Sequence, residues 1–352
     1  MTADLSPALR RWVEAETGST VVAAQTIGRG ASRQIWAVSL STDRELVVRV
    51  DTGDGPVAGT PLTLAREAAA YHALAGADVP IPWLHAVHPD GTALLLDRVP
   101  GDDQLTALAE PERRSVAEDF GRCLGRLHQL APDGLELGPL AIPNGVDPTA
   151  HDVGLWCSID RSRRSESSSP VAPVALRQLA ASVPSATRVS LCHGDAGPGN
   201  FLHDAGRVTA LLDWEFAHLG DPHDDLAWVA VRNQVLRHPL DVAATFAAWR
   251  TTTGAPIDLA RLEWFRALVL ARLLISCDAT IAWAGPDAAG ARVQAILRPF
   301  LAVAVFEALR RAGAADTDAG ELEGDVRAAW EGSPVAGLLD DPIRLDDLGA
   351  LL

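Results

Sequence analysis

The first hundred residues follow the apolar and polar pattern of a sheet. Three stretches rich in β-branched residues predict strands over residues 21–27, 35–40 and 45–50. Side chains alternate between the two faces of a strand, so in the third stretch Val47 and Arg49 share a face. The clearest further strand is the apolar run at residues 93–96, which ends just before Asp97.

One helix interrupts these strands. Thr60 and Pro61 are typical of an N-cap followed by proline at the first helical position. The helix is therefore predicted to run from there to about residue 74 and to stop at Gly76.

Beyond residue 101 the pattern turns helical. Amphipathic or apolar helices are predicted over residues 111–130, 174–182 and most of 229–313. Two short apolar stretches predict strands at residues 188–192 and 208–212. The charged, serine-rich segment 160–170 predicts a surface loop.

The net charge and the choice of basic residues exclude some partners and some chemistry. The formal net charge of −16 repels nucleic-acid phosphates and anionic lipid heads, so we expect neither a nucleic-acid nor a membrane partner. The same charge permits a cationic substrate. All 30 basic residues are arginine, which excludes a lysine nucleophile or Schiff base.

Cysteine usage and the N-terminus indicate the compartment. The four cysteines form no C-x-x-C pair and no zinc-type spacing, so we expect buried, reduced thiols. Residues 1–18 are charged and lack the apolar segment of a signal peptide. No uninterrupted apolar run reaches the ~18 residues that span a bilayer. We expect a cytoplasmic protein.

The densest chemical signal lies between two short predicted strands. His193-Gly194-Asp195 is followed by Asn200, and the second strand ends at Asp213. Phosphoryl transfer needs such groups, because its catalysis is mainly positioning and charge stabilisation. One carboxylate and one amide oxygen, here from Asp213 and Asn200, suit Mg²⁺. A further carboxylate, Asp195, can orient the acceptor hydroxyl and take its proton.

This constellation resembles the aminoglycoside phosphotransferase and choline kinase-like family. The resemblance rests on H-G-D-x-x-x-x-N at residues 193–200 and D-W-E at residues 213–215, and continues with Gly-Asp-Pro at 220–222 and Asp-Leu-Ala at 225–227. It implies an α+β, bilobal, protein-kinase-like fold. A small N-terminal lobe with an antiparallel sheet and a helix would comprise residues 1–97, and a larger, mainly helical lobe residues 98–352.

The resemblance also implies roles for these residues. Asp195 would be the catalytic base, and Asn200 and Asp213 would hold Mg²⁺. Asp225 would be a buried carboxylate that braces the catalytic loop, and His193 a hydrogen-bonded structural residue. The implied reaction moves the γ-phosphoryl group of ATP or GTP to the hydroxyl of a small molecule.

The N-terminal lobe supplies candidates for binding the nucleotide. A glycine hairpin with a nearby hydroxyl can approach phosphate oxygens, although a G-x-G between strands is more often only a turn. Arg49 replaces the lysine usual on this strand, and Glu67 is its natural ion-pair partner. Val47 would lie over the base, and the backbone at the end of the 93–96 strand would hydrogen-bond it. The candidates are Gly28, Gly30, Ser32, Val47, Arg49, Glu67, Asp97 and Val99.

The sequence does not identify the acceptor, and it allows two other functions to be considered. Loops of the helical lobe would bind the acceptor, with Trp156, Trp264 or Trp283 stacking on a ring and Glu215, Asp221 or Asp278 meeting an amine. Tryptophans at helical spacing are, however, more often core residues. A nucleotide-binding pseudoenzyme with a regulatory or scaffold role is the alternative function, favoured by Arg49. A protein kinase is disfavoured, because Gly220 comes only seven residues after Asp213, which leaves no room for an activation loop.

Overall fold

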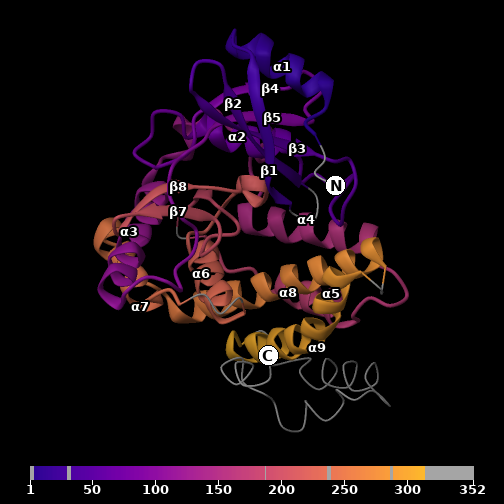
Figure 1. The fold of residues 1–352 in the computed structure, drawn as a ribbon. Helices are drawn as coiled ribbons and strands as arrows, with labels where there is room; N and C mark the ends of the chain where they lie inside the picture. Colours follow the sequence, from indigo (N-terminus) through magenta and orange to yellow (C-terminus); the bar gives the residue numbers. More distant parts are fainter. Residues whose placement is uncertain (1–3, 30–32, 187, 236–238, 286–287, 314–352) are drawn as a thin grey trace.

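The computed structural model describes residues 4–29, 33–186, 188–235, 239–285 and 288–313. Figure 1 shows a sheet with α1 and α2 at one end of the molecule and the long helices α8 and α9 at the other. Strands dominate the N-terminal region and helices the C-terminal region, which confirms the α+β prediction.

The N-terminal region is built on a five-stranded antiparallel sheet in the order β1-β2-β3-β5-β4. Its strands are β1 (Val21–Arg29), β2 (Arg33–Leu40), β3 (Glu45–Asp51), β4 (Leu84–Val87) and β5 (Ala93–Asp97). Three of these strands match the predicted ones closely, but β1 continues through Gly28 to Arg29 instead of ending at residue 27. A register shift between Thr26 and Gly28 accommodates the glycine within the strand.

The two faces of this sheet pack against different partners. Helix α1 (Pro7–Thr17) contributes Trp12 and Val13 to a cluster with one face, which includes Val48 of β3. Val47, on the opposite face of β3, packs instead against the main core of the molecule, to which α2 (Leu64–Ala73) belongs. The face that carries Val47 and Arg49 therefore points toward the rest of the protein.

Helix α2 begins later than the sequence indicated. Its N-cap is Thr63, not Thr60. The hydroxyl of Thr60 donates to the carbonyl of Val57 at 2.7 Å and accepts from the amide of Leu62 at 3.3 Å, so it closes a turn ahead of the helix.

The C-terminal region is mainly helical. Its helices are α3 (Glu110–Gln129), α4 (Pro148–Arg163), α5 (Val171–Ala181), α6 (His223–Val235), α7 (Val242–Thr253), α8 (Leu259–Ala284) and α9 (Ala289–Arg311). Two short antiparallel ribbons pair β6 (Ser190–Cys192) with β9 (His218–Gly220) and β7 (Phe201–Asp204) with β8 (Arg207–Leu211). A 3-10 turn, η3 (Trp214–Phe216), lies between β8 and β9.

The prediction of a loop over residues 160–170 is wrong in its first part. Helix α4 continues through Arg163, and the Arg164 guanidinium pairs with Asp160 one turn earlier at 2.8 Å. This ion pair closes the end of the helix, so a charged sequence that resembles a loop is helical there.

Helix α8 is, among the described residues, the one helix long and apolar enough to cross a membrane, with a mean hydropathy of 1.6 over its most apolar window. Most of that window, 61%, is buried inside the protein. Arg272, within this helix, is buried and ion-paired with Asp152 and Asp224. Packing in the core of the helical region accounts for the apolar character of α8.

Candidate active site

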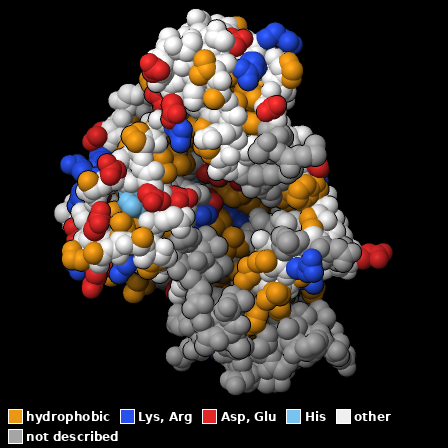
Figure 2. All heavy atoms as spheres, viewed as in Figure 1, with side chains coloured by type: hydrophobic (Ala, Val, Ile, Leu, Met, Phe, Trp, Pro, Cys, Tyr) orange, Lys and Arg blue, Asp and Glu red, His pale blue; other side chains and the backbone are white. Residues whose placement is uncertain are grey.

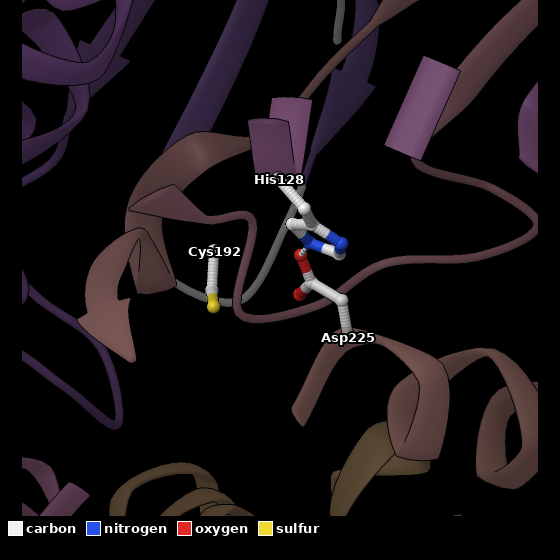
Figure 3. A group of neighbouring side chains, drawn as sticks. All are labelled: His128, Cys192 and Asp225. Atoms are coloured by element: carbon white, nitrogen blue, oxygen red, sulfur yellow. Dashed lines mark hydrogen bonds and ion pairs between the residues drawn. The ribbon is translucent and has the colours of Figure 1, made fainter. Parts of the chain in front are cut away.

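The candidate catalytic loop, residues 193–200, is held at its start by a buried carboxylate of α6. Asp225 lies fully buried in the first turn of α6, and its carboxylate accepts the backbone N–H groups of His193 and Gly194, each at 2.8 Å. His128 of α3 contacts the same carboxylate at 2.9 Å, and the two side chains point toward one another in Figure 3. Burial works against the charged form of Asp225, yet these hydrogen bonds hold the pKa of its carboxyl below the ordinary value.

A thiol completes this group without binding a metal. Cys192 lies close enough to His128 and Asp225 for the three to share an ion. Burial, however, raises the pKa of the Cys192 thiol well above its usual range, so the thiol keeps its proton. Asp225 is already occupied by three donors. The predicted bracing role of Asp225 fits this geometry, and a metal does not.

Asp195 and Asn200 face each other across the catalytic loop. The amide nitrogen of Asn200 donates to the Asp195 carboxylate at 2.7 Å and to its backbone carbonyl at 2.8 Å. Because the nitrogen is used in this way, the Asn200 amide oxygen is the atom left to bind a cation. His193 connects the start of the loop to the residue that follows β8, since its Nε2 contacts the carbonyl of Leu212 at 2.8 Å.

Asp213 lies where the short ribbons approach β3. Its backbone has φ 64° and ψ 64°, a left-handed conformation that aspartate tolerates better than most residues. Arg49 of β3 contacts the Asp213 carboxylate through Nη2 and the Glu67 carboxylate of α2 through Nε at 2.9 Å. The expected Arg49–Glu67 ion pair is present, and one guanidinium thus joins both lobes.

Carboxylates outnumber the cations around Arg49. Burial, together with the Asp213 carboxylate, raises the pKa of Glu215 to about 8. Burial also raises the pKa of Glu67 to about 7, against the opposing effect of Arg49. A cluster with this excess of negative charge and an open amide oxygen on Asn200 fits a hard divalent cation such as Mg²⁺. Glu215 therefore lies with the groups expected to contact the nucleotide and the metal. This position does not favour the alternative role of binding an acceptor amine.

The other nucleotide candidates occupy the sheet and its last strand. Gly28 lies within β1, whereas Gly30 and Ser32 lie outside the described residues. The N–H of Asp97 is used, because it donates to the carbonyl of Trp83 at 2.9 Å. Val99, two residues on, has no hydrogen-bond partner for its backbone N–H or C=O within the described part of the chain, so both can meet a base.

Several residues considered for the acceptor are used elsewhere. Trp156 and Trp264 are buried in the core. Asp221 is fully buried and pairs with Arg261 at 2.7 Å. Asp278 accepts the backbone N–H of Ser169 at 2.9 Å. Trp283 is 43% exposed, so of these three tryptophans it is the one whose ring a ligand could reach.

Arg232 is a further residue of this site, and no sequence motif indicates it. Its guanidinium contacts both carboxylate oxygens of Asp195 at 2.6 Å. Burial raises the pKa of Asp195, and the positive charge of Arg232 opposes that rise. The spacing within α6 could have indicated it, because Arg232 lies seven residues after Asp225. Two turns of helix take about 7.2 residues, so both side chains face the catalytic loop.

Figure 2 shows a hollow between the two lobes, with acidic and basic side chains inside it. Asn200, which hydrogen-bonds Asp195, accepts the backbone N–H of Leu212 at 2.9 Å, and the next residue, Asp213, contacts Arg49 of the sheet. The residues with the strongest sequence signal therefore lie in one charged site at the junction of the lobes.

Comparison with known proteins defines the class. A family model described as "Phosphotransferase enzyme family" matches residues 23–274, and the chain belongs to this family. Acyl-CoA dehydrogenase family member 10 of Mus musculus is 27% identical over 210 residues, which make up 56% of this chain. The match spans only 19% of that protein.

Solved structures show the same fold. A structure from Ralstonia eutropha JMP134, described as "a putative aminoglycoside phosphotransferase", superposes with a TM-score of 0.65 at 21% identity, covering 86% of this chain and 98% of that one. The ternary complex of APH(2")-IIa with streptomycin and ATP superposes with a TM-score of 0.56 at 14% identity, covering 78% and 91%. The protein-kinase-like fold is thereby confirmed.

Proposed function

We propose that this protein transfers the γ-phosphoryl group of ATP or GTP, with Mg²⁺, to a hydroxyl of a small molecule. The observation that carries the proposal is the convergence of Asp195, Asn200 and Asp213 with the Arg49–Glu67 ion pair. Membership of the phosphotransferase family supports it. ATP bound in one solved relative of the same fold supports the choice of nucleotide.

Each residue has a definite task in this reaction. Mg²⁺, when bound, neutralises phosphate charge, and Asn200 and Asp213 would hold it. Arg49 would contact the α- and β-phosphates while Glu67 fixes its direction. Val99 would offer its backbone groups to the base, and Val47 would pack against it.

Asp195 acts at the acceptor. Its carboxylate accepts a hydrogen bond from the acceptor hydroxyl and orients the oxygen toward the γ-phosphorus. The hydroxyl oxygen forms its bond to phosphorus as the bond to the β-γ bridging oxygen breaks, so the nucleoside diphosphate leaves. The proton of the hydroxyl passes to Asp195.

The pseudoenzyme alternative loses its main support. Arg49 keeps the positive charge and the ion pair with the helix glutamate, Glu67, that the kinase pattern requires at this position. The carboxylate proposed as the base, Asp195, and both proposed metal ligands, Asn200 and Asp213, also support an active enzyme.

The test is nucleoside diphosphate release with Mg²⁺ and ATP or GTP across a panel of hydroxylated compounds. The panel contains aminoglycosides, amino alcohols and macrolides, which range from cationic to mainly neutral. We expect acceptor-dependent release by the wild type and none by Asp195→Ala, whose affinity for ATP and Mg²⁺ should stay near that of the wild type. Full activity of Asp195→Ala would exclude it as the base. Nucleotide binding without release would favour the pseudoenzyme.

A further inference from the structure

Arg232 forms a clamp on the catalytic loop. Its Nη1 lies 2.6 Å from each oxygen of the Asp195 carboxylate. Its Nε and Nη2 donate to the carbonyl of Pro198 at 3.2 and 2.8 Å. The side chains of Arg232 and Asp195 are only 14% and 15% exposed, so water weakens this ion pair little.

The catalytic loop is shaped to hold this guanidinium. Gly197 and Gly199 have φ of 146° and 90°, values that favour glycine. A Cβ added at Gly197 would lie 3.1 Å from Cδ of Arg232, and one at Gly199 would lie 3.2 Å from its Nη2. Both glycines therefore leave room for Arg232, and the contact is part of how the loop is built.

The hydrogen bonds distinguish the two carboxylate oxygens of Asp195. Oδ2 accepts from both Arg232 and the Asn200 amide, whereas Oδ1 accepts from Arg232 alone among the described residues. A carboxylate oxygen has two acceptor sites, so Oδ1 keeps one for a further donor.

We infer that Arg232 is a positioning residue that turns Oδ1 of Asp195 toward the acceptor hydroxyl and places a positive charge beside the transferred phosphoryl group. The inference rests on the proposed phosphotransferase function. A fixed cation at this point stabilises the negative charge that the phosphoryl oxygens carry in the transition state. Since Arg232 does not contact Asp213, its effect belongs to phosphoryl transfer and not to nucleotide binding.

A purely structural role would give a different result, because a buried ion pair that loses one partner destabilises the protein. Arg261 offers a matched control. Its side chain is 11% exposed and pairs with buried Asp221 at 2.7 Å. Arg261→Ala should therefore lower the melting temperature much as Arg232→Ala does, while keeping the wild-type kcat.

The experiment measures kcat and KM for acceptor and nucleotide in the wild type, Arg232→Ala, Arg232→Lys and Arg261→Ala, together with acceptor-independent ATP hydrolysis. We expect Arg232→Ala to lose kcat by about 100-fold with an unchanged nucleotide KM. Arg232→Lys should recover part of the loss. Added guanidinium at millimolar concentration should raise the activity of Arg232→Ala and leave Arg261→Ala unaffected.

The outcomes separate this inference from the proposed function. An active wild type with an equally active Arg232→Ala overturns the role of Arg232 alone. Equal losses of kcat in Arg232→Ala and Arg261→Ala, with no rescue by guanidinium, would show that the arginine is only structural. A wild type that turns over neither an acceptor nor water would overturn the phosphotransferase proposal, and the role of Arg232 with it.

Discussion

Arg49 shows how one side chain can connect two lobes through chemistry that lysine lacks. Its Nε faces Glu67 and its Nη2 faces Asp213, so two separate nitrogens serve two carboxylates. A lysine has one terminal nitrogen on a flexible stem and cannot hold both contacts in this geometry. The arginine is therefore suited to this site. Because the chain contains no lysine at all, a coding bias is enough to explain why arginine occurs here.

This geometry predicts a graded response to substitution at residue 49. Arg49→Lys should keep partial activity, with kcat/KM for the nucleotide lower by about tenfold, or about 1.4 kcal/mol. Arg49→Ala should lose far more and should unfold more readily, because buried Glu67 would lose its ion-pair partner. Steady-state kinetics with varied ATP and thermal melting test both.

The control for this series is Arg44→Lys, at an exposed site on the turn before β3, which should behave as the wild type. Wild-type kinetics in Arg49→Lys would mean that only charge matters at this position. A complete loss of activity would mean that the fork geometry of the guanidinium is essential.

At the scale of elements, α3 and α7 pack so closely that glycine is required between them. A Cβ added at Gly121 of α3 would lie 2.2 Å from the carbonyl oxygen of Thr245 on α7. Gly154 of α4 is also within a helix, yet it is exposed and has nothing within 4 Å of an added Cβ.

Alanine at these two glycines should therefore have opposite effects on the free energy of unfolding. Gly121→Ala should lower it by about 3 kcal/mol through overpacking. Gly154→Ala should raise it by about 0.5–1 kcal/mol, because alanine favours the helix. Urea unfolding of both variants tests the contrast, and equal effects would contradict the close packing of α3 on α7.

A buried histidine couples β9 to α6. His218 donates Nδ1–H to the carbonyl of Phe216 at 3.0 Å, and its Nε2 faces Asp224 at 2.9 Å. Both ring nitrogens thus face acceptors, as in the charged form. Burial disfavours the charge, but Asp152 and Asp224 overcome this effect and raise the pKa of His218.

The sign of this shift fixes a pH dependence of stability. Because the pKa of His218 is raised in the folded state, its charge contributes fully to the free energy of unfolding below about pH 6.5, the ordinary pKa of histidine. This contribution is lost as the pH rises through the folded-state pKa. The gap in unfolding free energy between the wild type and His218→Gln should be larger at pH 6 than at pH 9. A gap that is constant with pH would mean that the folded state does not raise the pKa of His218, and a gap that is smaller at pH 6 than at pH 9 would mean that His218 is neutral in the folded protein.

Sequence predicted the parts of the site that depend on local order. Asp195, Asn200 and Asp213 lie within one short stretch, so their spacing alone indicated shared chemistry. His128 contacts Asp225 from 97 residues away, and no local pattern indicates that contact. Helix α4 was missed in part because buried Asp152 and Asp160 interrupt its apolar pattern, and their ion pairs with arginine exist only in the folded chain.

At the scale of the whole molecule, the lobes are joined by polar contacts on several sides of the site. Arg49 reaches Asp213, and Arg66 of α2 donates to the carbonyl of Ala217 at 2.9 Å. The indole N–H of Trp283, at the end of α8, donates to Asp54 in the loop after β3. The division of the chain at residues 97 and 98 stays a prediction, but these contacts make the nucleotide site depend on both lobes.

A ligand bound at such a junction should stabilise the whole protein. At a free concentration 100 times its Kd, Mg²⁺-ATP would add about 2.7 kcal/mol to the free energy of unfolding. We expect a rise in melting temperature with Mg²⁺-ATP that chelation of Mg²⁺ with EDTA reduces. Asp213→Asn should lose the Mg²⁺-dependent part of the rise, since a neutral amide binds Mg²⁺ more weakly than a carboxylate. Asp195→Asn, a matched change in the same site, should keep it, because the catalytic base is not expected to hold the metal. An equal loss in both variants would mean that Asp195 also binds Mg²⁺, and the separation of base from metal ligands in this site would then be wrong.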